Sequence, residues 1–295
     1  MSSPPDRTTS NTPVGLDQRL GVGADELKAR VHAFYSGLNA YLADSTLDAY
    51  VQFFNWGYLP VEGFPNDWPG GLPAAMLDRH AVRLVLELIG PIGVDGRDVL
   101  DVGCGRGGTL ATLAARFAPR SLVGVDLNPM SITHCRQAHA DPRLRFFQGD
   151  AEDLAFGDGS FDLITNIESS NAYPHIDRFY REVNRVLRPG GHFAYTDLLQ
   201  PDQFVHARDF LSANGFALEA DRDITVNVLA ARREAAKVQL RAFNADDAGT
   251  TDPTHAALMR YFLAPEGSEF FDSIDDGRFE YRILRFRKIA DCVDL

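Results

Sequence analysis

The stretch VLDVGCGRGGT, from Val99 to Thr109, decides the fold of this chain. A short apolar run ends at Asp101, and four glycines then occur within six residues. Glycine permits a tight turn and a close approach of a ligand to the backbone, and the first turn of a following helix offers unpaired N–H groups. Gly103, Gly105 and Gly108 complete the pattern G-x-G-x-x-G. The stretch therefore predicts a β-loop-α unit that binds a small ligand.

Strand and helix patterns alternate downstream of this stretch. Apolar strands are predicted at residues 98–103, 121–127, 144–150, 160–169 and 192–199, each separated by a helical pattern or a loop. Such alternation predicts a parallel, doubly wound α/β sheet. Residues 278–289, RFEYRILRFRKI, alternate polar and apolar side chains and predict a further strand near the C-terminus.

The remaining segments are organised around this core, which we place at residues 91–200. Residues 1–20 are polar and predict a disordered tail. Residues 21–90 predict an N-terminal helical piece, with helices at Ala24–Phe34, at Thr46–Phe54 and within 73–90. Residues 201–275 predict a helical insert that caps the substrate site, and residues 276–295 complete the sheet.

Composition narrows the class of function. The net charge of −12 disfavours nucleic acid and anionic membranes as partners. The three widely spaced cysteines suit a reduced protein, and no Cys/His cluster suggests a metal. No apolar run reaches the roughly 20 residues of a membrane span, and the N-terminus lacks an apolar signal core. We therefore expect a cytoplasmic protein that acts on a small molecule.

Three carboxylates separate the ligands that use such a glycine loop, namely NAD, FAD and S-adenosylmethionine (SAM). Asp101 ends the first core strand, where an acid suits the ammonium group of SAM better than a pyrophosphate. Asp126 ends the next strand and can bind two ribose hydroxyls, which suits NAD and SAM equally. Asp150 follows the third strand and can bind an adenine amino group.

The motifs DVGCGRGG, GVDLNPMSI, GDAEDLAFGDGSFDLI and EVNRVLRPGGHF resemble those of class I SAM-dependent methyltransferases, in the same order and spacing. The resemblance covers residues 95–198 and implies a Rossmann-like, seven-stranded sheet with one antiparallel strand. It implies SAM as cofactor, S-adenosylhomocysteine as product and no metal. The cofactor-binding positions that it implies are Asp101, Gly103 and Gly105 at the methionine half, Asp126 and Leu127 at the ribose, Asp150 and Ala151 at the adenine, and Asn166 beside the sulfur.

A wider resemblance covers most of residues 50–290. FFNWGY (residues 53–58), residues 167–198 and FEYRILRFRK are similar to segments of phthiotriolone-type, polyketide and cyclic-peptide O-methyltransferases. This resemblance implies methylation of a hydroxyl on an apolar natural product, in secondary metabolism such as antibiotic biosynthesis. It also implies an aromatic lid and makes the apolar N-terminal and insert helices candidates for a homo-oligomer interface. The predicted lid and substrate residues are Tyr35, Trp56, Tyr58 and Tyr173.

The catalytic group should follow the fourth core strand. His175 is the first candidate for a general base, because the pKa of histidine lies near neutrality. Alternatively, His175 caps the next helix or only packs there. Glu168 is the second candidate, as a base, as a residue that orients His175, as a substrate ligand, or as a loop hydrogen-bond acceptor.

Other reactions fit the same residues. C-methylation of a terpenoid or other alkene would use Glu168 and the aromatic rings to stabilise a carbocation. N-methylation, formation of a carboxyl methyl ester, and a non-catalytic SAM-binding protein are further alternatives.

Overall fold

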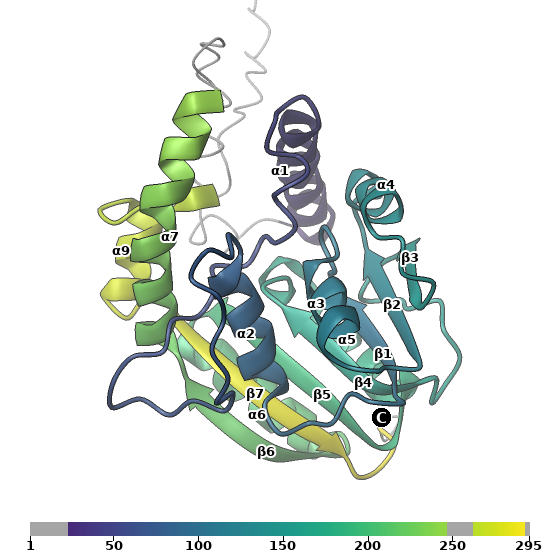
Figure 1. Cartoon of the computed structure of the whole chain (residues 1–295). Helices are drawn as coiled ribbons and strands as arrows, with labels where there is room; N and C mark the ends of the chain where they lie inside the picture. Colours follow the sequence, from purple (N-terminus) through teal and green to yellow (C-terminus); the bar gives the residue numbers. More distant parts are fainter. Residues whose placement is uncertain (1–22, 247–261, 293–295) are drawn as a thin grey trace, which may run out of the picture.

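The computed structural model describes residues 23–246 and 262–292, and its centre is a seven-stranded sheet (Figure 1). The strand order is β3-β2-β1-β4-β5-β7-β6, and β7 runs antiparallel to both of its neighbours. The strands are β1 (Asp98–Val102), β2 (Ser121–Asp126), β3 (Leu144–Gln148), β4 (Phe161–Ile167), β5 (Leu187–Leu199), β6 (Phe216–Asp223) and β7 (Glu280–Lys288). The predicted Rossmann-like sheet with one antiparallel strand is confirmed.

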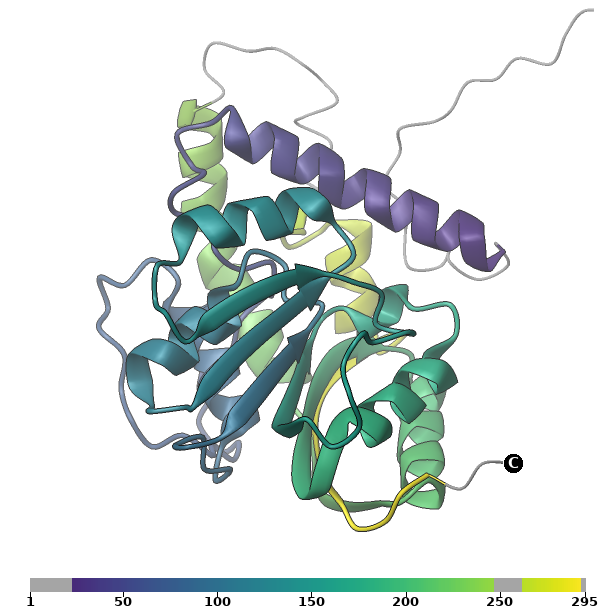
Figure 2. The ribbon, with the colours of Figure 1, turned by 90° about the vertical axis from the view of Figure 1, so that its right-hand side faces the viewer.

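Helices cover both faces of the sheet, as Figures 1 and 2 show. One apolar core joins the sheet to α2, α3, α4, α7 and α9, and a second core lies beneath α5 and α6. The helices are α1 (Ala24–Ala43), α2 (Arg79–Ile89), α3 (Gly108–Arg116), α4 (Pro129–Ala138), α5 (Ile176–Val186), α6 (Pro201–Ala213), α7 (Thr225–Asp246) and α9 (Glu269–Asp275), with a short 3₁₀ turn, η2, at Ser170–Ala172. Because helices cover both faces, β1, β4 and the second half of β5 are almost continuously buried.

Helix α1 belongs to neither of the two groups of helices that cover the faces, and it crosses above the sheet (Figure 2). It packs near the ends of β1, β2 and β4, where parallel strands of this fold class position ligands. A separate apolar cluster joins Leu38 and Leu42 of α1 to Leu263. The N-terminal helix therefore closes one side of the ligand-binding edge.

The helix predicted at Thr46–Phe54 is wrong. Residues 44–50 form turns, and residues 51–54 have no regular secondary structure. Two backbone carbonyl groups of this segment bond to the glycine loop: Gln52 accepts from the N–H of Gly108, and Asp48 accepts from the Arg106 guanidinium. These tertiary bonds use carbonyl groups that a continuous helix would need. The helical pattern within 73–90 is realised only from Arg79 onward.

The segment 201–275 is less uniformly helical than predicted, because residues 216–223 form the edge strand β6. This strand alternates poorly and carries four charged residues in its eight positions, so its sequence does not show a strand pattern. The predicted tail at 1–20 lies outside the described residues, as do residues 247–261 of the predicted insert. Within the ranges 23–246 and 262–292, no helix has the length and hydropathy needed to cross a bilayer.

Candidate functional site

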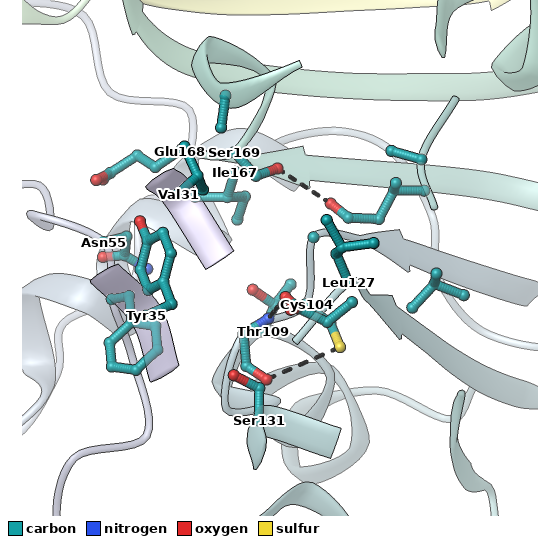
Figure 3. A pocket seen from close by; sticks show the side chains of 18 of the residues that line it. Val31, Tyr35, Asn55, Cys104, Thr109, Leu127, Ser131, Ile167, Glu168 and Ser169 are labelled. Carbon is teal, nitrogen blue, oxygen red and sulfur yellow. Dashed lines mark hydrogen bonds between the residues drawn. The ribbon is translucent and has the colours of Figure 1, made fainter. Parts of the chain in front are cut away.

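A cavity lies between α1, the glycine loop and the ends of β1, β2 and β4 (Figure 3). Six of the predicted cofactor residues line it, namely Gly103, Gly105, Asp126, Leu127, Asp150 and Ala151. They come from the connections that follow β1, β2 and β3, and the parallel register brings these connections to one edge of the sheet. The sequence motifs thus meet in space as the topology requires.

The glycine loop owes its shape to backbone conformations that favour glycine. Gly103 has a φ of +72° and Gly105 a φ of +52°. A Cβ atom at Gly103 would lie 2.3 Å from Oγ of Ser169 and 2.8 Å from the hydroxyl of Tyr173. Because Gly103 has no side chain, the end of β1 can lie close to the residues that follow β4.

Asp126 holds the glycine loop and faces the cavity. One carboxylate oxygen accepts the Gly105 N–H over 2.8 Å, and the other accepts the Asn128 N–H over 2.8 Å. Burial raises the pKa of Asp126, and these two hydrogen bonds oppose that shift. Each oxygen retains acceptor capacity, because a carboxylate can accept about four hydrogen bonds in all.

Two predicted cofactor residues do not line the cavity. Asp101 is buried and accepts a 2.6 Å hydrogen bond from the hydroxyl of Thr165. Burial raises the pKa of Asp101 to about 7. Asn166 is also buried, and its amide donates to the Val102 carbonyl and to Ser169. Both side chains bond across the β1–β4 pair, and Asn166 also holds Ser169, so they support the loops that form the cavity.

Glu168, at the end of β4, does line the cavity. Its φ of +50° is uncommon for a residue other than glycine, and it turns the chain sharply after the strand. Its Oε1 accepts the Trp56 N–H over 2.7 Å. Burial raises the pKa of Glu168 to about 8, although Tyr281 and the Trp56 N–H act in the opposite direction. Glu168 thus combines access to the cavity with a pKa near neutrality.

His175 lies elsewhere. It occupies the N-cap position of α5 without a side-chain capping bond, its side chain is exposed, and it is not among the residues that line the cavity. Its backbone N–H donates to Glu152 over 2.7 Å. Our preferred general base is therefore not supported by the geometry. The η2 turn, absent from the sequence interpretation, precedes His175, and the last residues of this stretch that line the cavity are Ala172 and Tyr173.

The predicted aromatic lid divides into two groups. Tyr35 and Tyr173 line the cavity together with Phe53 and Phe54, which come from the FFNWGY segment. Figure 3 shows Tyr35 on the side of the cavity where Asn55 and Glu168 lie. Trp56 and Tyr58 are buried behind this wall and do not line the cavity. Their rings belong to the apolar core that also contains residues of α2 and α9.

Trp56 and Tyr58 instead fix the segment to the rest of the molecule. The ring of Trp56 packs edge-on against Phe270 of α9, with ring centroids 4.9 Å apart. The Tyr58 hydroxyl donates to the carbonyl of Pro65 or to the side chain of Asn66. These contacts lie on the side of the segment away from the cavity, and they hold the cavity-lining residues Phe53–Asn55 in place.

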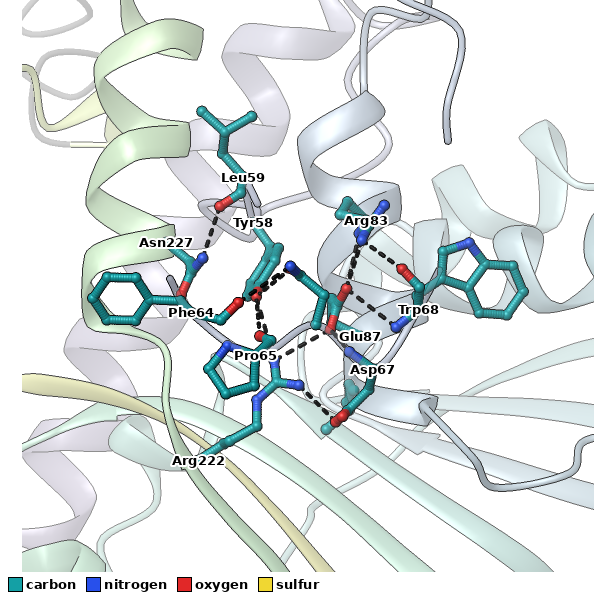
Figure 4. Close-up of polar contacts among 12 residues, drawn as sticks. Tyr58, Leu59, Phe64, Pro65, Asp67, Trp68, Arg83, Glu87, Arg222 and Asn227 are labelled. Atoms are coloured by element: carbon teal, nitrogen blue, oxygen red, sulfur yellow. Dashed lines mark hydrogen bonds and ion pairs between the residues drawn. The ribbon is translucent and has the colours of Figure 1, made fainter. Parts of the chain in front are cut away.

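A buried network of ion pairs anchors the loop that follows Tyr58 (Figure 4). At its centre is Glu87 of α2, which is fully buried. Glu87 accepts from the backbone N–H of Asp67 over 2.7 Å and from the side chains of Arg83 and Arg222 over 3.0 and 3.2 Å. Asp67 also pairs with Arg222 over 2.7 Å. The network ties the loop to α2 and β6, so it stabilises the platform on which the FFNWGY segment rests.

Several cavity-lining residues were not predicted from the sequence. They include Lys28 and Val31 of α1, Thr109 of α3 and Ser131 of α4. Thr109 and Ser131 stand at helix starts that the glycine loop and the Asn128-Pro129 pair already marked, so their positions could have been inferred. Lys28 and Val31 give no such signal, because nothing in the sequence of α1 shows which face meets the sheet edge.

The lining residues fit SAM. The glycine loop exposes backbone where any Cβ at Gly103 would collide, and the Asp126 carboxylate faces the same space. Aromatic rings of Tyr35 and Phe54 provide apolar and cation-attracting surface on the opposite wall. Among residues 23–246 and 262–292, no group of three or more His, Cys, Asp or Glu is placed to bind a metal ion.

Comparisons with known proteins agree with this site. Residues 100–195 match the family model described as a methyltransferase domain. The chain is 35% identical over 246 residues to the phthiotriol/phenolphthiotriol dimycocerosates methyltransferase of Mycobacterium leprae, covering 81% of this chain and 86% of that protein. It is 45% identical over 150 residues to a fatty-acid O-methyltransferase of Mycolicibacterium smegmatis, covering 50% of this chain and 53% of that protein.

A solved structure shares the fold. The crystal structure of the [4+2]-cyclase SpnF matches with a TM-score of 0.66 and 21% identity, covering 88% of this chain and 95% of the cyclase. One fold can support different reactions, so this match concerns architecture alone. The extent of the identity to the Mycobacterium leprae enzyme settles the family. The chain belongs to the SAM-dependent methyltransferases.

Proposed function

We propose that this methyltransferase acts on a hydroxyl group of an apolar, lipid-like molecule and that Glu168 is its general base. The observation that carries the proposal is the position of Glu168, which faces the cavity from the end of β4. The names of the two mycobacterial relatives describe lipid methylation, and that supports a lipid-like acceptor.

We also propose how the cofactor is held. Gly103 and Gly105 would contact its methionine half, Asp126 and Leu127 its ribose, and Asp150 and Ala151 its adenine. All six residues line one continuous cavity. When bound, SAM supplies a methyl group on a positively charged sulfur, which departs as a neutral thioether.

Glu168 would remove the proton of the acceptor hydroxyl while the hydroxyl oxygen forms a bond to the methyl carbon. With a pKa of about 8, this carboxyl is mostly protonated at pH 7. Only its ionised fraction acts as a base, and that fraction grows with pH. Buried neighbours set this balance: Asp197 raises the pKa, whereas Arg232 and Tyr281 lower it. The proton taken by Glu168 can then pass to solvent when the product leaves.

Apolar surface favours an acceptor with a hydrocarbon body. Tyr35 and Phe54 pack with ring centroids 5.6 Å apart, and Phe54 packs against Phe262 at 5.5 Å. Phe53, Ile167 and Ala172 extend this wall around Glu168. Burying an alkyl chain here would contribute about 0.8 kcal/mol for each CH₂ group.

The same rings are the specific observation that favours a second candidate, C-methylation of an alkene. Aromatic faces stabilise a developing carbocation, and Glu168 could then remove a proton from carbon. The two candidates differ in the atom that carries the new methyl group.

The deciding experiment uses SAM labelled with ¹³C in its methyl group. The full-length enzyme is incubated in turn with a long-chain alcohol, a long-chain phenol, a fatty acid and an isoprenoid alkene. We expect a methoxy carbon signal from the alcohol or the phenol that survives mild alkali. Label found only in an alkyl carbon would establish the second candidate. Label found only in an ester that alkali hydrolyses would remove the base role from Glu168.

A further inference from the structure

Helix α1 contributes a charged side chain to the cofactor site. Nζ of Lys28 lies 2.7 Å from Oδ2 of Asp150 and 2.7 Å from Oε2 of Glu152. Oδ1 of the same Asp150 accepts the Glu152 N–H over 3.0 Å. Lys28 thus sits between two carboxylates on the connection that follows β3, and both Lys28 and Asp150 line the cavity.

Two further residues of α1, Ser36 and Asn39, bond to the other cofactor loops. Nδ2 of Asn128, just after β2, donates to Oγ of Ser36 over 2.9 Å. Asn39 donates to Oγ of Ser131 over 3.0 Å and accepts from the guanidinium of Arg106 over 3.1 Å, and Arg106 belongs to the glycine loop. Each of the three connections that form the cofactor site is therefore bonded to α1.

The spacing of these α1 residues places them on one face. Positions 28, 36 and 39 are separated by 8 and 3 residues, which at 3.6 residues per turn confines them to a sector of about 80°. A single helix face therefore contacts all three cofactor loops. Lys28 is the only one of the three that carries a charge, and its partner is the residue proposed to bind adenine.

We propose that Lys28 is a positioning residue of the cofactor site, which holds the Asp150 carboxylate in place for the adenine and couples cofactor binding to the seating of α1. This inference rests on the proposed cofactor site but not on the identity of the methyl acceptor. Lys28 acts through Asp150 and has no assigned role in the transfer of the methyl group.

Electrostatics explains why a cation is needed here. The side chain of Glu152 is only 4% exposed, and apart from Lys28 it accepts the backbone N–H of His175. Without Lys28, a buried carboxylate would face Asp150 uncompensated, and their repulsion would turn Asp150 away from the cavity. Burial alone would lower the pKa of Lys28, but the bonds to Asp150 and Glu152 raise it overall, so Lys28 is charged at neutral pH.

The test measures binding of S-adenosylhomocysteine to the full chain by calorimetry. We expect Lys28→Met to weaken binding by about tenfold or more, the loss of one partly buried ion pair. Lys28→Arg should restore most of the affinity. Arg30→Met is the matched control, because Arg30 lies on the same helix, its side chain is 39% exposed, and it pairs with Glu26. It should bind as the wild type does.

A second arm tests whether Lys28 acts through Asp150. In an Asp150→Asn background, adding Lys28→Met should cost much less than it does in the wild type, since the carboxylate that it orients is gone. Equal affinity of Lys28→Met and Arg30→Met, or full additivity of Lys28→Met with Asp150→Asn, would overturn the proposal. A wild-type enzyme that binds S-adenosylhomocysteine but methylates no alcohol would sink the proposed acceptor and leave this inference standing.

Discussion

The backbone N–H of Trp56 donates a 2.7 Å hydrogen bond to the carboxylate of Glu168, across 112 residues of sequence. This bond joins the FFNWGY segment to the end of β4, and it fixes the direction of the one acidic side chain that faces the cavity from that strand. The wall of the cavity and the proposed base are therefore positioned together, and several consequences can be measured.

Replacing Glu168 by Gln should abolish most of the turnover. The amide keeps the size of the side chain but cannot accept the proton, so kcat should fall by roughly 10²- to 10⁴-fold. Affinity for S-adenosylhomocysteine, measured by calorimetry, should stay close to that of the wild type. His175→Ala is the matched control and should retain its turnover, because His175 is exposed outside the cavity. The opposite ranking of the two variants would return the base role to His175.

The dependence of the methyl-transfer rate on pH should follow the ionisation of Glu168. An acid with a raised pKa is protonated below that pKa and ionised above it, so a base of this kind gains activity as pH rises. With a pKa of about 8, log(kcat/KM) for an alcohol acceptor should climb with unit slope below pH 8 and level off above it. Steady-state rates between pH 6 and 9.5 provide the profile. A rate that falls through pH 8 would show that the protonated carboxyl is the active form.

Gly103→Ala should destroy the cofactor site. The alanine would have to adopt a φ of +72°, at a cost of about 1–2 kcal/mol, and its Cβ would lie 2.3 Å from Oγ of Ser169. Calorimetry with S-adenosylhomocysteine should detect no binding. Gly159→Ala isolates the effect of conformation, because Gly159 has a φ of +57° but its nearest contact to a Cβ is 3.8 Å away. That control should lose some stability and keep its affinity.

Much of this site could be predicted from sequence, because the cofactor motifs are local. Gly103, Asp126 and Asp150 each end a strand, and parallel strands bring their carboxyl ends to one edge. Asp101 lies outside the cavity lining, and sequence spacing does not show that its side chain bonds to Thr165 instead. Lys28 could not be found, since a lysine on an amphipathic helix is usually solvated. The β6 strand was missed because polar edge strands lack an apolar alternation.

The ion-pair network around Glu87 predicts a stability effect remote from the cavity. Glu87→Ala leaves Arg83 and Arg222 without their buried partner, which should cost about 3–5 kcal/mol of unfolding free energy in urea denaturation. Glu219→Ala removes an acid of similar size whose side chain is 38% exposed and pairs with Arg287. We expect that control to change stability by less than about 1 kcal/mol. Equal losses in the two variants would contradict the structural role given to the network.

The place of β7 in the sheet has a consequence for how the enzyme is made. β7 follows all other strands in the chain, yet it lies between β5 and β6 and contributes Tyr281 beside Glu168. During synthesis, β5 and β6 leave the ribosome with unpaired edges, and only the last strand joins them. The surroundings of Glu168 are therefore completed after the loops that form the cofactor site. A nascent chain can form its cofactor pocket before the proposed base has its final neighbours.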